Sequence, residues 1–418
     1  MQVCIHIFME SQYESTEKGL SKMSAIKLQE NIYSVGVLNP SLRVFDIVME
    51  SRYGTSYNAY LLTGEKNVLI DTVHPDYFDE YLSNIESVID VQKIDYLIMN
   101  HTEPDHSGSI GKLLEKNPNI MVFGTLAAKK FISAIINKEF ACTVVKNGDT
   151  LDIGSQTLEF IVAPLLHWPD SMFTWAPLSK ALFTCDFLGA HFCEPTMLDS
   201  KTHYEKQYWE QFQYYYGGIF GPFKPYVLAG LDKIKDLPIE IVCPSHGPCL
   251  TKNIQKCQEL YREWSTPVEH EKKIAAVLYA SAYGCTAKLA QAAYEELSKN
   301  SELDVRLVDI VFTPLGEVIT LANEADALFM GSCTINKDAP KVVWDVLCSI
   351  DAINVKQKPA GAFGSFGWSG EAVDMIKSRM QHLRYDFVGD GVKANFMPDE
   401  EDIAKMKAYA LEVAAKIK

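Results

Sequence analysis

The hexapeptide His101-Thr102-Glu103-Pro104-Asp105-His106 places four potential metal ligands within six residues. It directly follows the apolar run 96–99, which predicts a strand, and a loop at a strand end can aim several side chains at one point. Pro104 and Gly108 are also common turn residues, so the hexapeptide alone is compatible with an exposed polar loop as well as with a metal site.

Three further candidates each follow a short apolar run, and they are His167, Asp186 and His246. A single histidine in such a place is more often structural, and a single aspartate more often caps a helix or forms a turn. Together with the hexapeptide, however, they give four imidazoles and three carboxylates, enough for two metal ions with one bridging carboxylate. Asp71, at another strand end, is a candidate partner for the free ring N–H of a ligand histidine, or a turn residue.

These seven residues resemble the dinuclear site of the metallo-β-lactamase superfamily, whose pattern is H-x-H-x-D-H followed by later His, Asp and His ligands. This chain departs from that pattern at one position, because Glu103 stands where the zinc hydrolases have their second histidine. A carboxylate is a hard, anionic oxygen donor, so the substitution favours iron over zinc.

The variant H-x-E-x-D-H is similar to the flavodiiron proteins, and the spacing of the later ligands suits that family. The resemblance implies a four-layer αββα metallo-β-lactamase-like fold of the α+β class for this half of the chain. The family varies in the orientation of the histidine that corresponds to His106, since that side chain is sometimes turned away from the metal. The resemblance implies one iron on His101, Glu103 and His167, another on Asp105, His106 and His246, and Asp186 as the bridge.

The sequence from residue 274 onward alternates predicted strands and helices in five units, which predicts a doubly wound α/β fold with a parallel sheet. The loop 281–286 offers hydroxyls, a glycine and a helix N-terminus but no Walker lysine, so it suits a monophosphate better than a triphosphate. The loops 331–336 and 365–370 also follow strands, at the edge where such sheets bind ligands, and Trp368 offers a stacking face.

The three loops together resemble those of flavodoxin, which implies a flavodoxin-like fold and a bound FMN. We expect the phosphate in the first loop and the isoalloxazine ring between the other two. The predicted FMN contacts are Ser281, Tyr283, Gly284, Cys285, Thr286, Ser332, Thr334, Ile335, Asn336, Ser365, Phe366, Gly367, Trp368 and Gly370.

The composition, with 47% hydrophobic and 22% charged residues, is that of an ordinary globular protein. A net charge of -15 argues against nucleic acid as the main partner. No apolar run is long enough for a membrane helix and no signal-peptide pattern opens the chain, so we expect a cytoplasmic protein without a membrane partner. The ten cysteines include no C-x-x-C pair, which favours reduced thiols and excludes a built-in rubredoxin or iron-sulfur module.

The sequence predicts three segments: an N-terminal extension (1–22), a metallo-β-lactamase-like diiron domain (23–266) and a flavodoxin-like FMN-binding domain (267–418). Met23 is a candidate natural start. The resemblance implies an oxidoreductase that reduces dioxygen to water, nitric oxide to nitrous oxide, or both, through FMN and the iron pair. It also implies a head-to-tail homodimer or a dimer of dimers. Because the flavodoxin-like domain ends the chain, we expect a separate electron donor such as a rubredoxin.

Two other functions remain open at this point. The first half could be a dinuclear zinc hydrolase, with the flavodoxin-like half as a redox regulator, although Glu103 argues against zinc. Alternatively, the protein could be an electron carrier whose metal site is vestigial, although the complete ligand set argues against that.

Overall fold

The computed structural model describes residues 24–418, and the chain divides between Thr266 and Pro267 into two compact units. The predicted N-terminal extension, residues 1–22, lies outside the described residues. Among residues 24–418, none of the helices has both the length and the apolar composition needed to cross a bilayer. Residues 24–266 form the first unit and residues 267–418 the second unit.

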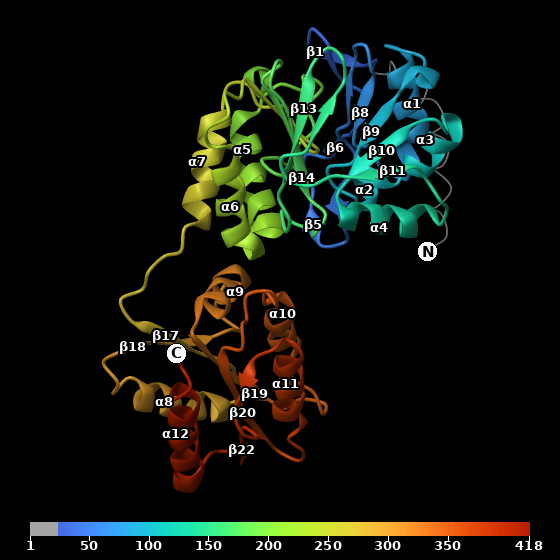
Figure 1. The fold of residues 1–418 in the computed structure, drawn as a ribbon. Helices are drawn as coiled ribbons and strands as arrows, with labels where there is room; N and C mark the ends of the chain where they lie inside the picture. Colours follow the sequence, from blue (N-terminus) through green and yellow to red (C-terminus); the bar gives the residue numbers. More distant parts are fainter. Residues whose placement is uncertain (1–23) are drawn as a thin grey trace, which may run out of the picture. The chain divides into compact units, whose positions relative to one another are not determined.

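The first unit is built on two β-sheets (Figure 1). The seven-stranded sheet contains, in spatial order, β1 (Ile26–Gln29), β2 (Ile32–Ser34), β7 (Tyr60–Leu62), β8 (Val68–Ile70), β9 (Tyr96–Ile98), β10 (Met121–Gly124) and β11 (Cys142–Val144). The five-stranded sheet contains β12 (Thr150–Asp152), β13 (Thr157–Val162), β14 (Met172–Ala176), β15 (Ala181–Cys185) and β16 (Ile241–Pro244). Two short ribbons join β3 (Val37–Asn39) to β6 (Thr55–Tyr57), and β4 (Val44–Phe45) to β5 (Met49–Glu50).

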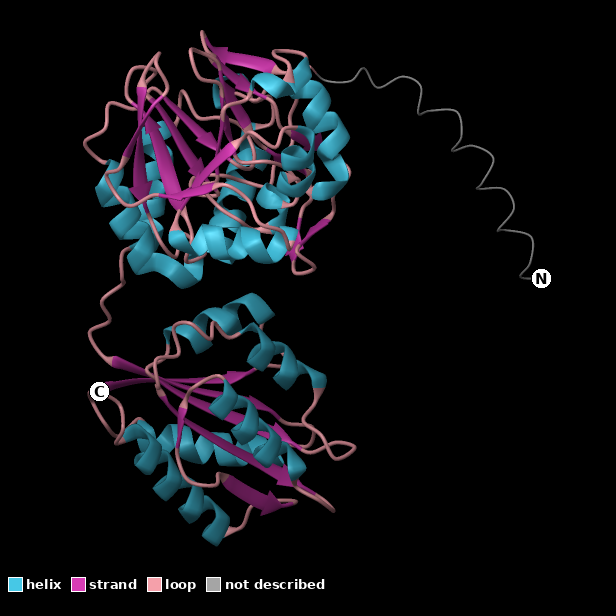
Figure 2. Ribbon diagram, turned by 45° about the vertical axis from the view of Figure 1, so that its right-hand side comes forward, coloured by secondary structure: helices cyan, strands magenta, loops and turns pink. Residues whose placement is uncertain are grey.

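Helices cover the outer faces of both sheets (Figures 1 and 2). Beside the seven-stranded sheet are α1 (Phe78–Glu86), α2 (Pro104–Ser107), α3 (Ile110–Lys116) and α4 (Leu126–Ile136). Beside the five-stranded sheet are α5 (Glu205–Tyr215), α6 (Lys224–Ile234) and α7 (Ile254–Ser265). Shorter turns of helix lie at Pro75–Tyr77, Val91–Lys93, Asp199–Lys201, Tyr216–Phe220 and Gly221–Phe223.

The alternation of side chains along the strands explains this layering. Successive residues of a strand point to opposite faces of its sheet. Ile70 of β8 packs with Phe160 of β13 in a buried cluster between the sheets, whereas Leu69 of β8 belongs to the cluster under the outer helices. Apolar residues on both faces therefore produce the αββα arrangement that was predicted.

The second unit is a parallel sheet in the order β18-β17-β19-β20-β21, with β22 also paired to β20. Its strands are β17 (Lys273–Ala280), β18 (Leu303–Asp309), β19 (Ala327–Cys333), β20 (Pro359–Phe366), β21 (Asp386–Phe387) and β22 (Val392–Asn395). Its helices are α8 (Cys285–Leu297), α9 (Leu315–Glu324), α10 (Lys341–Ser349), α11 (Glu371–His382) and α12 (Glu400–Ala414).

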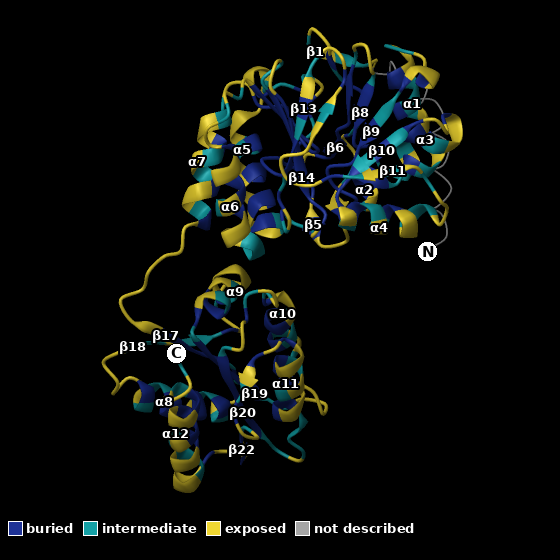
Figure 3. Ribbon diagram, viewed as in Figure 1, coloured by how far each residue is buried: buried dark blue, intermediate teal, exposed yellow. Residues whose placement is uncertain are grey.

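Both faces of this second sheet are covered, as in a doubly wound fold. Residues of α8 and α12 pack on one face in one buried cluster, and residues of α9, α10 and α11 pack on the other face in a second cluster. The central strands β17, β19 and β20 are consequently buried while the outer sides of the helices are exposed (Figure 3). The predicted α/β fold class of this half is therefore confirmed.

Candidate dinuclear metal site and cofactor loops

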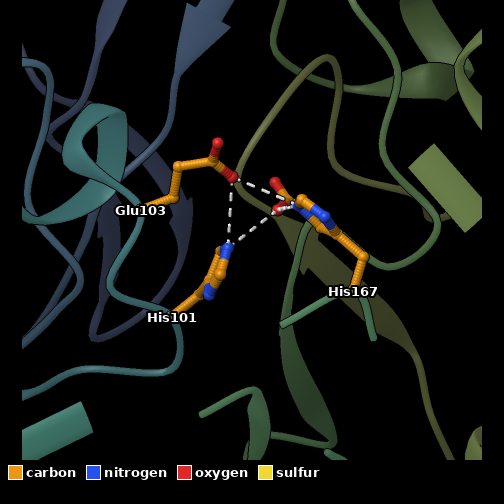
Figure 4. Close-up of side chains that lie close together, drawn as sticks. His101, Glu103 and His167 are labelled. Atoms are coloured by element: carbon orange, nitrogen blue, oxygen red, sulfur yellow. Dashed lines mark hydrogen bonds and ion pairs between the residues drawn. The ribbon is translucent and has the colours of Figure 1, made fainter. Parts of the chain in front are cut away.

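The first group of candidate ligands joins the loop after β9 to the loops after β13 and β15. Nε2 of His101 and Nε2 of His167 lie 3.3 and 3.2 Å from Oε2 of Glu103. The same two nitrogens lie 3.6 and 3.3 Å from Oδ2 of Asp186. In Figure 4 the side chains of His101, Glu103 and His167 point toward one another.

The second group lies on the other side of Asp186. Nε2 of His106 is 3.3 Å from Oδ1 of Asp105, and Nε2 of His246 is 3.1 Å from Oδ2 of Asp105. Both nitrogens also face Oδ1 of Asp186, at 3.1 Å for His106 and 3.4 Å for His246. His106, whose orientation the sequence left open, is turned inward.

Asp186 is therefore shared by the two groups, because Oδ2 faces one set of histidines and Oδ1 faces the other. Donor atoms bound to one metal ion at about 2.1 Å lie about 3.0 to 3.4 Å apart for octahedral or tetrahedral geometry. All the separations fall in this range except the 3.6 Å between Nε2 of His101 and Oδ2 of Asp186, which is slightly longer. The structure thus brings together all seven residues that the sequence singled out, in two sets with one common carboxylate.

Several of these buried polar atoms have no hydrogen-bond partner among the described residues. They are both carboxylate oxygens of Asp105, both ring nitrogens of His106 and Oδ1 of Asp186. A buried polar group without a partner costs roughly 1–3 kcal/mol, so a fold keeps several of them together only where something else satisfies them. A pair of cations between the two groups would do so, and the residues present therefore fit a dinuclear metal centre.

The charge state of the carboxylates suits cations as well. Burial alone would raise the pKa of Glu103, but hydrogen bonds from His101 and His167 outweigh it and hold that pKa below its ordinary value. Burial likewise opposes ionisation of Asp186, yet the charge of the nearby His106 holds its pKa well below the usual range. Both groups are anionic oxygen donors, the type that favours a hard cation such as iron.

Two of the histidines are oriented by hydrogen bonds at Nδ1, the ring nitrogen that faces away from the other candidate ligands. Nδ1 of His101 lies 3.2 Å from Oδ2 of Asp170, and Nδ1 of His246 lies 2.6 Å from the backbone oxygen of Ser56. When Nδ1–H donates to these oxygens, the lone pair of Nε2 is directed at the site. The sequence left Asp71 as either such a partner or a turn residue, and among the described residues no hydrogen bond joins its side chain to the ring of a candidate ligand. Asp71 instead accepts the backbone N–H groups of residues 100 and 101, at 2.7 and 3.4 Å.

Asp46 is a neighbour of the site that the sequence did not reveal. It lies in the turn between β4 and β5, and its side chain hydrogen-bonds to Glu103. Burial is the main cause that raises the pKa of Asp46 to about 7, and the contact with Glu103 adds to it. Asp46 and Ile47 both have positive φ, 45° and 61°. No ligand-like motif surrounds Asp46, so only the fold brings it to the site.

Glu103 and His167 are the most exposed of the seven candidate ligands. The side chains of Glu103 and His167 are each 13% exposed, whereas those of His101 and His106 are fully buried. Asp46 stands beside Glu103 on the same side. A small molecule would therefore reach the site past Glu103 and His167.

The predicted phosphate loop follows β17 in the second unit. Gly284, with φ +83°, precedes the first turn of α8, and a Cβ there would meet no atom within 4 Å. The hydroxyl of Ser281 accepts the N–H of Ala287 at 3.2 Å, and Thr286 is hydrogen-bonded to Ser365 at 2.8 Å. Both hydroxyls therefore shape the loop, and the N–H groups that the first turn of α8 leaves free are the better partners for a phosphate.

The other predicted FMN contacts follow β19 and β20 at the same edge of the sheet. The N–H of Thr334 donates to the backbone oxygen of Ser365 at 3.1 Å, which joins the two loops. Trp368 is 75% exposed and available for stacking on a planar ring. The remaining predicted contacts lie within or beside these loops, and they are Tyr283, Cys285, Ser332, Ile335, Asn336, Phe366, Gly367 and Gly370.

A fourth loop at this edge was missed from the sequence. It follows β22, where the N–H of Phe396 donates to the backbone oxygen of Phe366 at 2.7 Å and Asn395 Nδ2 donates to that of Gly367 at 3.0 Å. The ring of Phe396 is 64% exposed. An aromatic residue after a short edge strand carries no cofactor motif, which is why only the structure reveals it.

Comparison with known proteins agrees with the fold of both units. Residues 55–247 match the family described as ODP family beta lactamase, and residues 277–408 match flavodoxin. The chain is 48% identical to the flavo-diiron protein FprA2 of Clostridium acetobutylicum, over 94% of this chain and 100% of that protein. It is 30% identical to the anaerobic nitric oxide reductase flavorubredoxin of Escherichia coli, over 93% of this chain and 82% of that protein.

Among solved structures, the rubredoxin oxygen:oxidoreductase of Desulfovibrio gigas is 29% identical and superposes with a TM-score of 0.68, over 94% of this chain and 98% of that one. The flavodiiron protein of Giardia intestinalis is 26% identical, with a TM-score of 0.67 over 94% and 96% of the two chains. The likeness therefore spans both units rather than one alone.

Proposed function

Because the chain belongs to the flavodiiron protein family, whose members are oxidoreductases that carry FMN and a two-iron site, we propose that it reduces dioxygen to water, nitric oxide to nitrous oxide, or both. The predicted family, enzyme class and cofactors are thereby confirmed. The gas that is reduced and the role of each residue are our proposal.

The observation that carries the proposal is the position of Asp186 between two sets of donors. We assign one iron to His101, Glu103 and His167 and the other to Asp105, His106 and His246. A diatomic oxidant needs both metal ions side by side, and a single carboxylate that faces both sets supports that arrangement.

When bound, FMN would supply electrons one at a time, and a pair of irons held by the seven candidate ligands would supply the redox chemistry for a diatomic oxidant. The chain's own residues prepare the site for this reaction. Asp170 and Ser56 hold His101 and His246 in the tautomer that presents Nε2. Burial of most donors excludes water, and the exposed sides of Glu103 and His167 leave an approach for a gas molecule.

In the second unit, we assign the FMN phosphate to the loop 281–286 and the isoalloxazine ring to the loops 331–336 and 365–370. Support comes from the positive φ of Gly284, which a loop of this shape requires, and from the exposed ring of Trp368. A rubredoxin-like protein is the proposed electron donor, because the Desulfovibrio gigas relative is described as a rubredoxin oxygen:oxidoreductase. We also propose a head-to-tail homodimer or a dimer of dimers, to be tested by analytical ultracentrifugation.

Anaerobic reduction of the protein followed by stopped-flow mixing with each gas tests the proposed substrates. Fast reoxidation of the flavin with dioxygen, nitric oxide or both is the expected result. Replacement of Asp186 by Ala should abolish this reoxidation while FMN stays bound, because the two iron positions lose their common ligand. Unchanged turnover in Asp186→Ala would falsify the bridging assignment.

Metal analysis of the purified protein tests the ligand chemistry separately. We expect two iron ions per chain, because carboxylates supply three of the seven donors. Two zinc ions per chain together with hydrolytic activity would instead support the dinuclear hydrolase and contradict the proposed gas reduction.

A further inference from the structure

Two thiols, those of Cys243 and Cys249, lie at the two ends of the loop that carries His246. Just outside them, Val242 and Leu250 exchange both of their backbone hydrogen bonds, each 2.9 Å long. The next residues inward in such an antiparallel pair stand opposite each other with their side chains on one face. Cys243 and Cys249 occupy those positions.

The two side chains meet in the core between the sheets. Both residues belong to the same buried cluster, and Cys249 is close enough to contribute to the raised pKa of the Cys243 thiol, after burial. In a pair of this kind the Cα atoms are about 4.5 Å apart, which is within the range that a disulfide spans. The hydroxyl of Tyr60 lies 3.5 Å from Sγ of Cys249, so the pair is packed from one side.

The loop between the thiols is held tightly at several points. Nδ2 of Asn58 donates to the backbone oxygens of Pro244 and Gly247, both at 2.8 Å. Gly247 has φ +76°, and a Cβ there would lie 2.7 Å from the backbone oxygen of Ala190. His246 therefore projects from a loop with little room to move, and its base is closed by the two cysteines.

We propose that Cys243 and Cys249 are a redox modification site at which hydrogen peroxide converts the two thiols into a reversible disulfide, here called the loop clasp. One sulfur attacks peroxide, the O–O bond breaks, and a sulfenic acid and one water result. The second sulfur attacks the sulfenic sulfur, the S–S bond forms, and the hydroxyl leaves as a second water with the remaining thiol proton. The two thiols lose two electrons and two protons, which one peroxide takes up.

Burial sets the speed of this reaction. Cys243 and Cys249 are 1% and 0% exposed, and burial raises the pKa of the Cys243 thiol well above its usual range. Thiolate is the reactive form, so clasp formation is slow and follows brief openings of the loop. The modification therefore responds to sustained oxidant, not to single turnovers.

The clasp has a mechanical effect on His246. A disulfide across the base of a short loop removes the open conformations through which the loop would release its ligand. Iron should consequently leave the oxidised protein several-fold more slowly than the reduced protein. This second readout rests on the proposed role of His246, whereas formation of the disulfide itself does not.

Disulfide mapping of the holoenzyme tests the proposal directly. The protein with FMN and iron bound is treated with hydrogen peroxide, unfolded in acid, alkylated and digested. The peptides with Cys243 and Cys249 should appear linked and free of alkylation, and dithiothreitol should reverse the link. A parallel arm with diamide, which also takes two electrons and two protons from a thiol pair, separates thiol oxidation from iron-catalysed damage.

Cys249→Ser should abolish the link, and Cys348→Ser, which changes an exposed thiol of the second unit, should leave it intact. Iron release to a chelator is then compared before and after oxidation of the unmodified chain. The proposal is overturned if both thiols remain alkylatable at oxidant levels that fully oxidise Cys348. A mapped disulfide with unchanged iron release would overturn the mechanical effect on His246, even if gas reduction were verified.

Discussion

Oδ2 of Asp170 lies 3.2 Å from Nδ1 of His101 and also accepts the N–H and the hydroxyl of Thr102, each at 2.7 Å. One buried carboxylate oxygen therefore fixes both the ring of a candidate ligand and the backbone that follows it. Such an outer partner orients the ring and raises its basicity toward a metal.

Asp170→Ala should lower iron affinity by about 10- to 100-fold, because His101 loses the group that holds its tautomer. FMN content should not change, since the flavin loops lie in the other unit. Titration with ferrous ion under anaerobic conditions measures the affinity. Asp232→Asn, which alters an exposed ion pair with Arg262, is the matched control and should bind iron normally. Equal iron affinity in the two variants would contradict the positioning role.

Removal of the metal should destabilise the first unit alone. The site gathers seven histidine and carboxylate side chains, most of them buried, and a bound ion stabilises only the folded form. Differential scanning calorimetry should show the transition of the first unit at a lower temperature after chelation, with that of the second unit unchanged. Removal of FMN should lower the transition temperature of the second unit and leave that of the first unit unchanged. A shift of both transitions by either treatment would contradict separate stabilisation of the two units.

Ile47→Gly should stabilise the turn between β4 and β5. Ile47 is 95% exposed with φ 61°, a left-handed conformation that disfavours a β-branched residue. Relief of that strain should exceed the entropic cost of glycine and raise the free energy of unfolding by roughly 0.5–1 kcal/mol. Urea unfolding measures the change. Val48→Gly is the control, because Val48 is also exposed but has no positive φ, and it should give no gain.

Gly284→Ala should weaken FMN binding by about tenfold through strain of roughly 1–2 kcal/mol at a left-handed position. The added methyl group has open space around it, so the effect comes from the backbone and not from a clash. Gly316 is equally unobstructed but lies in α9 without a positive φ, and Gly316→Ala should leave FMN affinity unchanged. Fluorescence titration of FMN compares the two. Equal FMN affinities of the Gly284→Ala and Gly316→Ala variants would contradict the proposed binding of the phosphate by the loop 281–286.

The fold class was predictable because periodicity and resemblance pointed to the same two architectures, and both were confirmed. The candidate ligands were predictable because each follows an apolar strand, so their sequence positions imply a common edge. That the structure gathers them agrees with this reasoning, while their role as ligands stays a prediction.

Other features depend on contacts that no local pattern encodes. Asp71 and Asp170 are both carboxylates near candidate ligands, and only the packing decides that Asp170 reaches the ring of His101. Asp46 approaches Glu103 because a two-strand ribbon carries it there. The loop of Phe396 likewise joins the flavin edge only through the pairing of β22 with β20.

If Asp186 bridges the two irons as proposed, the filling of the two positions would be cooperative. An ion held by Oδ1 or Oδ2 of Asp186 would fix the orientation of this carboxylate for the other set of donors. Each ion would then raise the affinity for the other by the same factor, as linkage requires. At limiting iron, a population of this protein should consist of empty and fully loaded molecules, with few that hold a single ion.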